Sequence, residues 1–180
     1  MTRKTKKEVV ILGSGFAAFT LLKKLNYKRF NVTVISPRNH FLFTPLLPSA
    51  AVGSLELRSI IEPIRIIRKK LNFVQAYALE INEEKKELKC RNALDNHEFA
   101  IRYDLLIIAV GSVSSTYNIP GVTEHAMPLK ELWDARQLRQ KIIDNFERAS
   151  SPNLTKDAIK NLLSFVVVGG GPTGVEFAAE

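Results

Sequence analysis

The chain has 180 residues, of which 46% are hydrophobic and 24% charged, and its formal net charge is +8. This composition predicts one ordinary globular domain and excludes a disordered or fibrous chain. No apolar run reaches the roughly 20 residues that span a bilayer, and the basic start, residues 1–7, leads into no secretory signal and shows no clear targeting signal.

The positive charge is spread along the sequence, with small clusters at residues 3–7 and 65–70. These clusters are not interleaved with aromatic residues and match no nucleic-acid motif, so we expect no nucleic-acid partner. The single cysteine, Cys90, excludes an intrachain disulfide and a C-x-x-C redox motif. The histidines are scattered, and we expect no metal site: His40, His97 and His125.

A strand–helix–strand unit opens the chain. Residues 9–12 form a β-branched run typical of a buried parallel strand, residues 16–25 have apolar positions at helical spacing, and residues 31–35 predict a second strand. The apolar stretch 41–53 follows, but Pro45, Pro48 and Gly53 argue against a long helix or a central strand there. We expect this loop to cover either a core or a ligand.

A further helix is predicted to begin at Ser59. Ser59 and Glu62 have capping-box spacing, and Pro63 falls in the first turn, where a missing N–H matters least. Beyond it, residues 73–81, 86–89 and 98–101 read as three strands separated by charged turns. Short strands joined by charged turns predict an antiparallel insertion rather than another crossover helix.

The second half returns to buried strands and helices. The stretch YDLLIIAVGS (103–112) predicts a continuous buried strand that ends in glycine, residues 129–148 predict a helix, and residues 154–161 a short one. The β-prone run 165–168 then predicts a last strand, followed by a glycine-rich turn and the start of a helix.

Two glycine loops repeat one pattern. A strand, then G-x-G-x-x-G, then a helix places backbone N–H groups and the positive end of a helix dipole against a pyrophosphate. The second loop carries an extra glycine, Gly170. The three key positions are Gly13, Gly15 and Ala18 in the first loop and Gly169, Gly171 and Gly174 in the second.

The usual next check is an acidic residue about 20 positions further on, which binds the ribose hydroxyls. After the first loop that place holds Ser36, Pro37 and Arg38, without a carboxylate. Serine can hydrogen-bond a ribose hydroxyl, whereas arginine can pair with a phosphate as in NADP sites. The motif alone therefore leaves FAD, NAD and NADP open for the first loop. For the second loop the diagnostic position lies beyond Glu180.

Two dinucleotide folds with an intervening strand that ends in YDLLIIAVG resemble the two-dinucleotide-binding-domain flavoproteins. Within them, VTVISPRNHFLFTPLLPSAAVG, SIIEPI and VVVGGGPTGVEFAAE resemble the type II (alternative, rotenone-insensitive) NADH:quinone oxidoreductases of the fungal mitochondrial type, from about residue 8 to residue 180. The resemblance implies an α/β protein with a Rossmann-like FAD-binding fold, an antiparallel β insertion and the start of a second Rossmann-like NAD(P)H-binding fold. We expect a basic tail at 1–7, an incomplete FAD-binding domain at 8–163 and a truncated NADH-binding domain at 164–180.

The resemblance also assigns roles to individual residues. For FAD, the pyrophosphate, adenosine, flavin-ring and closing positions would be Gly13, Gly15, Phe16, Ala17, Ser36, Pro37, Arg38, Thr44, Pro45, Leu46, Ala78, Ala109 and Gly111. The NADH pyrophosphate would lie against Gly170, Gly171, Pro172, Thr173 and Gly174. Glu176 and Glu180, the implied catalytic residues, would lie on the nicotinamide side of the flavin.

The implied activity is transfer of hydride from NADH to FAD and of two electrons from FAD to quinone, without proton pumping. The implied setting is the mitochondrial inner membrane, with peripheral association through regions that this sequence does not contain, and a homodimer in full-length relatives. Two alternatives stay open. The chain could be a truncated or degenerate product without activity, or it could be another FAD/NAD(P)H reductase of this superfamily that lacks the redox disulfide.

Overall fold

The computed structural model describes residues 6–180, which divide into two compact units. The first comprises the described residues up to Phe41 together with Glu62–Ser112, and the second comprises Leu42–Ile61 and Val113–Glu180. The chain passes between the units within two short paired strands, β3 (His40–Leu42) and β4 (Ile61–Pro63). The domain boundaries expected from the sequence stay a prediction, because compactness does not test which residues bind which nucleotide.

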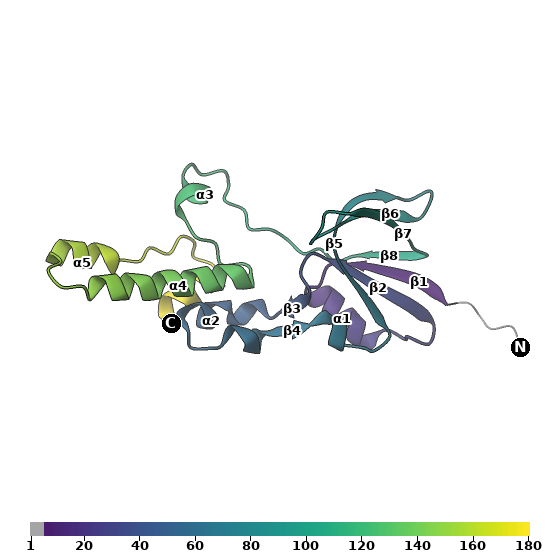
Figure 1. The fold of residues 1–180 in the computed structure, drawn as a ribbon, viewed down its shortest axis with the longest axis horizontal. Helices are drawn as coiled ribbons and strands as arrows, with labels where there is room; N and C mark the ends of the chain where they lie inside the picture. The colour runs from purple at the N-terminus through teal and green to yellow at the C-terminus, as the bar shows by residue number, and fades with distance from the viewer. Residues whose placement is uncertain (1–5) are drawn as a thin grey trace, which may run out of the picture. The chain divides into compact units, whose positions relative to one another are not determined.

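The first unit contains a six-stranded sheet in the order β7-β6-β5-β2-β1-β8 (Figure 1). Strands β1, β2, β5 and β8 are parallel where they pair, whereas β5, β6 and β7 pair antiparallel. The expected antiparallel insertion is therefore confirmed. The bounds are β1 (Lys7–Leu12), β2 (Phe30–Ser36), β5 (Leu71–Asn82), β6 (Glu87–Asn92), β7 (Glu98–Arg102) and β8 (Leu105–Ile108).

Helix α1 (Phe16–Lys24) connects β1 to β2 and packs on the parallel part of the sheet. Val9 and Ile11 of β1 are buried with Ala18 and Leu22 of α1, in a cluster that also takes residues from β2 and β5. Val10 and Leu12 belong to a second cluster of the same unit. Strand β1 is thus buried on both faces, which explains its continuous apolar run.

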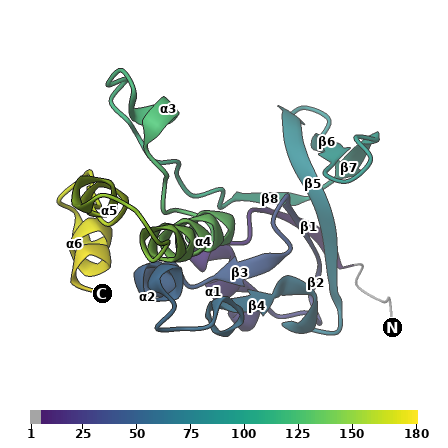
Figure 2. The ribbon, with the colours of Figure 1, turned by 60° about the vertical axis from the view of Figure 1, so that its left-hand side comes forward.

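The second unit is helical and begins with short elements. Its bounds are η1 (Thr44–Leu46), α2 (Leu47–Val52), η2 (Leu57–Ile60), α3 (Val122–His125), α4 (Leu132–Ala149), α5 (Lys156–Leu162) and α6 (Pro172–Ala179). Figure 2 shows α2 and α4 side by side, and their apolar faces share one core with Phe177 of α6. The expectation that the stretch 41–53 holds no long helix is confirmed, because α2 starts at Leu47 and ends before Gly53.

The helix predicted from Ser59 is wrong. The chain instead forms the end of η2, then β4, then η3 (Ile64–Ile66). Pro63 disfavours the helical region for the residue before it, and Pro63 itself is extended, with φ −62° and ψ 131°. The Ser59 hydroxyl donates to the carbonyl of Glu56 at 2.6 Å rather than capping a helix.

Two strand predictions also need correction. The stretch 103–112 contains a strand of only four residues, β8, whose position at the edge of the sheet leaves Leu105 and Ile108 44% and 63% exposed. Residues 165–168 are in no ladder with any other described residue, and Val166 is 87% exposed. An extended run becomes a strand only when a neighbour takes up its hydrogen bonds. High β-propensity was therefore not sufficient here.

Candidate dinucleotide-binding site

The strand order of the first unit reverses beside β1. The chain runs from β1 through α1 to β2 on one side, and returns to add β8 on the other side of β1. Ligands of open α/β sheets bind at the carboxyl ends of strands where the order reverses in this way. The first glycine loop follows β1, and Ala109 and Gly111 follow β8, so both lie at that edge.

Gly13 begins the turn between β1 and α1 in a conformation that a side chain would not tolerate. Its φ is +104°, and an added Cβ would lie 2.2 Å from the carbonyl oxygen of Ala109. The Gly13 N–H donates to Ile35 O, and the Ala109 N–H donates to Leu12 O, both at 2.8 Å. The ends of β1, β2 and β8 are thereby joined directly beneath the loop.

Gly15 and the helix that it starts have the features of an anion-binding helix N-terminus. Gly15 is the N-cap of α1, no side chain of residues 6–180 caps this helix, and no acidic residue lies in its first turn. Backbone N–H groups at the first turn therefore stay available to an anion. An added Cβ on Gly15 would meet only Nη2 of Arg38, at 4.0 Å. The space that Gly15 leaves thus borders a guanidinium group, which is a favourable neighbour for a phosphate.

Two buried hydroxyls support the loop from below. Ser14 is 2% exposed and Ser36 is 4% exposed, and their Oγ atoms lie 3.0 Å apart. Arg38 donates to both of them, from its backbone N to Ser36 Oγ at 3.2 Å and from Nε to Ser14 Oγ at 3.4 Å. The three residues come from the β1–α1 loop and the end of β2. They place a positive charge beside the glycine loop, at the place where the dinucleotide motif usually has an acidic residue.

Several other residues predicted to bind FAD also lie in the first unit, and those named here are exposed. Phe16, the first residue of α1, stacks edge-on against Phe41 with 5.0 Å between ring centroids. Ala17 is exposed on α1, and Ala78 is exposed on β5 next to an irregularity in the β5–β6 register. Gly111 has no heavy atom within 4 Å of an added Cβ. Open backbone at Gly15 and Gly111 thus fits a dinucleotide such as FAD.

The second glycine loop is formed within the second unit, although its preceding strand is not. An added Cβ on Gly174 would lie 2.2 Å from the carbonyl oxygen of Gly169, so the turn closes tightly on the helix. Gly171 is the N-cap of α6 and Pro172 lies at its first position. Gly170 and Gly171 have open space around them. This is the arrangement that a pyrophosphate site needs.

The remaining predicted residues also belong to the second unit. Thr44, Pro45 and Leu46 form η1, with Thr44 half-buried and the other two exposed. Glu176 is exposed on α6. The site residues are thus divided between two units, each of which carries one glycine loop.

Glu180, at the end of α6, is held by two serine hydroxyls. Ser49 Oγ donates to Oε1 at 2.5 Å, and Ser54 Oγ donates to Oε2 at 2.8 Å. These hydrogen bonds, Ser49 first, lower the pKa of the Glu180 carboxyl below its ordinary value of 4.5. Sequence reasoning proposed Glu180 but missed both serines, which are more than 120 positions away from it in the sequence. No local pattern could have paired them.

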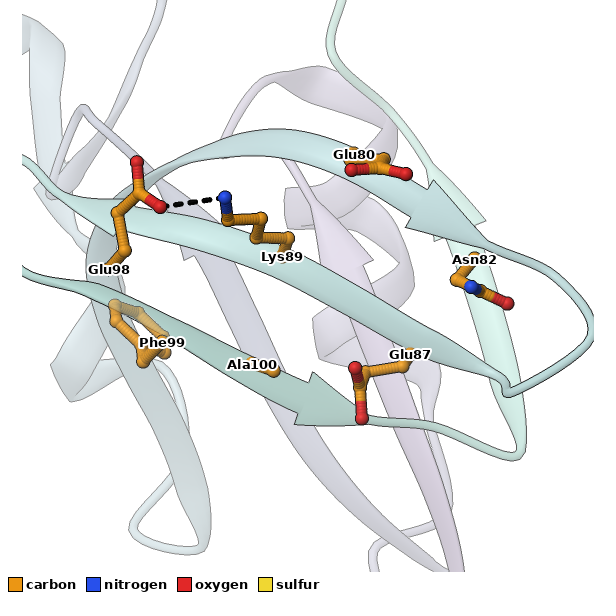
Figure 3. A pocket seen from close by; sticks show the side chains of 7 residues that line it. All are labelled: Glu80, Asn82, Glu87, Lys89, Glu98, Phe99 and Ala100. Atoms are coloured by element: carbon orange, nitrogen blue, oxygen red, sulfur yellow. Dashed lines mark ion pairs between the residues drawn. The ribbon is translucent and has the colours of Figure 1, made fainter.

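Other features of the described residues carry no comparable site. A hollow of about 380 Å³ on the β5–β6–β7 ribbon is lined mainly by charged side chains, and its Lys89 pairs with Glu98 at 2.7 Å (Figure 3). Burial raises the pKa of the Cys90 thiol to about 11.

Within residues 6–180, no three His, Cys, Asp or Glu side chains are grouped so as to hold a metal ion. None of the helices in this part of the chain has the length and apolarity to cross a membrane.

Comparison with known proteins decides the family. Residues 7–180 match the family described as pyridine nucleotide-disulphide oxidoreductase. The chain belongs to this family. Its α/β, Rossmann-like fold class is thereby confirmed.

Individual relatives are closely similar. The chain is 52% identical to the external alternative NAD(P)H-ubiquinone oxidoreductase B4, mitochondrial, of Arabidopsis thaliana, over 97% of this chain and 31% of the relative. It is 48% identical to the external NADH-ubiquinone oxidoreductase 2, mitochondrial, of Saccharomyces cerevisiae, over 97% and 33%. The structure of NDH2 from Plasmodium falciparum in complex with NADH has a TM-score of 0.92 at 39% identity, over 97% and 36%.

The resemblance to type II NADH:quinone oxidoreductases is therefore confirmed. The chain spans about a third of the length of the relatives that it matches.

Proposed function

We propose that this chain provides the FAD-binding loop and the beginning of the NADH-binding fold of an FAD-dependent, non-proton-pumping NADH:quinone oxidoreductase. The observation that carries the proposal is the loop at the end of β1. There Gly13 must be glycine for lack of space, whereas Gly15 has room for a ligand beside Arg38. Relatives about 50% identical to the chain and named as NADH- or NAD(P)H-ubiquinone oxidoreductases support the same function.

In this proposal the chain's own residues bind and orient. Gly15 and the first turn of α1 would hold the FAD pyrophosphate, with Arg38 beside it. Gly171 and the first turn of α6 would hold the NADH pyrophosphate. The chemistry that bound FAD supplies is acceptance of hydride from NADH and delivery of two electrons to quinone. No nucleophilic side chain is required, and Cys90 takes no part.

The remaining assignments extend the same proposal. The flavin ring would lie against Thr44, Pro45 and Leu46, the adenine against the backbone of Ala78, and the nicotinamide on the side of Glu176 and Glu180. The relatives named above from Arabidopsis and Saccharomyces are mitochondrial. We propose a mitochondrial location for this chain too, with peripheral association with the inner membrane and dimerisation both depending on regions outside these 180 residues.

An absorption spectrum of the purified chain, before and after NADH is added under anaerobic conditions, tests the proposal. A flavin band that bleaches means that both nucleotide sites function. A flavin band that persists means that FAD binds but NADH does not deliver hydride. Absence of flavin, with none taken up from added FAD, contradicts the proposal for this chain.

A second candidate is a non-catalytic product of the same family. The observation that favours it is the run 165–168, which precedes the NADH loop and is exposed and unpaired among the described residues. A run that pairs with no neighbouring strand holds the loop after it loosely. NADH would therefore bind weakly even with FAD in place. Retention of FAD without any bleaching by NADH would favour this candidate.

A further inference from the structure

A group of basic residues, here called the basic face, lies at the edge of the sheet where the parallel strands begin. Lys7 of β1 pairs with Phe30 of β2, and Val32 of β2 pairs with Leu71 of β5, so the segments that precede β2 and β5 lie at the same edge. The face is formed by exposed side chains from the end of α1, the turn before β2 and the segment before β5: Lys23, Lys24, Lys28, Arg29, Arg65, Arg68, Lys69 and Lys70.

The segments of the basic face are joined to one another, and few acidic groups balance their charge. Nη2 of Arg68 donates to the carbonyl oxygen of Lys23 at 3.1 Å, which links the segment before β5 to the end of α1. Lys23 also pairs with Glu62 at 3.9 Å. Glu62 is the only acidic residue in the stretches 19–31 and 62–72. Among residues 6–180, the other basic side chains of the face have no carboxylate partner, so the face is strongly positive.

The proposed nucleotide site does not account for this charge. The first glycine loop follows the carboxyl end of β1, whereas the basic face lies where the parallel strands start. Strand β1 has six residues and therefore separates the two edges by about 20 Å. This distance is more than twice the screening length of about 8 Å at physiological salt. The positive charge is thus free to serve a different anionic partner.

One large apolar side chain is exposed within the basic face. Ile66 is 70% exposed, whereas Ile64, two positions earlier, is fully buried in the core of the unit. Arg65 precedes Ile66 in the sequence, and Arg68 follows two positions later. Exposure of this side chain to water is unfavourable. A phospholipid surface suits both features, because its anionic headgroups lie directly above an apolar layer.

We propose that the basic face docks on an anionic phospholipid membrane, with Ile66 entering between the lipid headgroups. The lysines and arginines around it would lie against the lipid phosphates. This contact goes beyond the proposed function, because it lies within the 180 residues and adds to membrane association through regions outside them. It requires neither FAD nor NADH.

The aromatic residues beside the basic face favour a lipid surface over a nucleic acid. Lys23 Nζ lies 4.0 Å from the ring centroid of Phe19, and the same ring is stacked on Phe41 with 4.0 Å between centroids. Arg65 Cζ lies 4.9 Å from the ring centroid of Phe73, which is only 6% exposed. Proteins that bind single-stranded nucleic acids stack bases on open aromatic rings. These rings are already covered, whereas a membrane needs only the charges and the exposed isoleucine.

Sedimentation of the 180-residue chain with lipid vesicles tests the proposal. The chain should bind phosphatidylcholine vesicles that contain phosphatidylglycerol, and binding should weaken as salt is added. Pure phosphatidylcholine vesicles should bind it at least about tenfold more weakly. They also measure non-specific adhesion of the chain to lipid. Lys69→Gln combined with Lys70→Gln should weaken binding to the anionic vesicles by about 25-fold, which is about fivefold for each cation removed.

The matched control for charge is Lys85→Gln combined with Lys86→Gln. This pair is also adjacent and exposed, but it lies in the turn after β5, at the other end of that strand from residues 69 and 70. The control variant has the same net charge as the test variant. Its affinity for anionic vesicles should stay within about twofold of the wild-type value, because the removed charges lie beyond the screening length from the bound surface.

The apolar part of the contact is tested separately. Ile66→Ser should weaken binding by about tenfold, because less apolar area leaves water, and should keep the wild-type salt dependence. Leu94→Ser is the matched control, since Leu94 is 79% exposed in the same unit but lies outside the basic face. All substituted side chains are exposed. Wild-type midpoints of denaturant unfolding should therefore show that the variants remain folded.

Several outcomes would overturn the proposal. They are equal binding to vesicles with and without phosphatidylglycerol, equal losses in the two lysine double variants, and wild-type affinity in Ile66→Ser. Displacement of the chain from anionic vesicles by a single-stranded RNA at the same phosphate concentration would assign the face to a nucleic acid instead. Flavin content is measured on the same preparations, so failure of the docking surface and failure of the proposed function are distinguished.

Discussion

Ser49 donates a hydrogen bond of 2.5 Å to Glu180, across 131 positions of the sequence. With the second bond from Ser54, it fastens the end of α6 to the segment around α2. Both glutamate oxygens are occupied by neutral donors, which stabilise the ionised form of the carboxyl. Glu180 is therefore a carboxylate held in one orientation, although it is exposed to solvent.

This network predicts a pH dependence. The pKa of Glu180 is lowered, so its contribution to stability is fully present above the ordinary value of 4.5 and is lost as the pH falls through the lower folded value. Ser49→Ala should raise the Glu180 pKa toward its ordinary value, because Ser49 is the first cause of the shift. The ¹³C shift of the Glu180 side-chain carboxyl, followed as acid is added, measures both values.

The control for this titration is Ser59→Ala, which removes an exposed hydroxyl of the same unit that makes no contact with Glu180. It should leave the Glu180 pKa unchanged. Identical titration curves for wild type and Ser49→Ala would show that the hydrogen bond does not hold in solution.

The two glycines of the first loop should lose very different amounts of stability when they are replaced by alanine. Gly13→Ala should cost on the order of 3 kcal/mol of unfolding free energy, because its positive φ and a carbonyl oxygen 2.2 Å from the new Cβ leave no room. Gly15→Ala should cost less than about 1 kcal/mol, since φ is −82° and no clash arises. Denaturant unfolding of the two variants measures the difference.

The flavin content of the Gly15 variants should fall although they fold. Folded Gly15→Ala protein should retain little FAD, and Gly15→Val none, because a side chain fills the space where the phosphate approaches the backbone. Released flavin is quantified by absorbance after denaturation. Wild-type flavin content in folded Gly15→Val protein would remove this loop from the proposed site.

The parts of the fold that sequence reasoning predicted correctly are those in which local and long-range requirements agree. In β1, α1 and β2, apolar periodicity, glycine spacing and burial all favour one arrangement, so Val9–Leu12 and the helix from Phe16 were identified from pattern alone. At Ser59 a capping-box spacing competed with the restriction that Pro63 imposes on its neighbour, and the restriction prevailed.

Long-range pairing explains what the sequence could not predict. The run 165–168 has the composition of a strand, but strand formation depends on a partner that composition does not reveal. The Ser14–Ser36 pair and the Ser49–Glu180 bond join residues through the fold rather than through spacing. Ser14 was visible only as the variable position of a glycine motif. Its burial and its hydrogen bond with Ser36 became visible only in the structure.

The exposed run 165–168 predicts poor behaviour of the chain in solution. Val166 and Val168 are 87% and 70% exposed and lie in no ladder with other described residues, so the run offers apolar edges to other molecules. Val166→Lys should raise solubility and change the unfolding free energy by less than about 0.5 kcal/mol. Light scattering at increasing concentration, compared with wild type, measures the effect.

Hydrogen exchange gives an independent measure of the same run. The amides of residues 166–168 should exchange without protection, whereas those of Val9–Leu12 in β1 should be protected up to the global unfolding free energy. Cooperative protection of Val166–Val168 would mean that the run finds a partner in solution, and the second candidate function would then lose its support.

Cys90 provides a probe of how tightly the antiparallel ribbon is closed. The residue is fully buried on β6, and burial raises the pKa of its thiol to about 11. At pH 8 only about one molecule in a thousand would carry the reactive thiolate even if the reagent could reach it. Alkylation of the native chain should therefore proceed only as fast as β6 opens, and should become rapid in denaturant.

The reaction rate of a free thiol such as glutathione sets the scale for this measurement. Labelling of native protein at the rate expected for an exposed thiol would show that β5, β6 and β7 separate readily, and mass spectrometry of the labelled peptide around Cys90 would confirm the site of reaction.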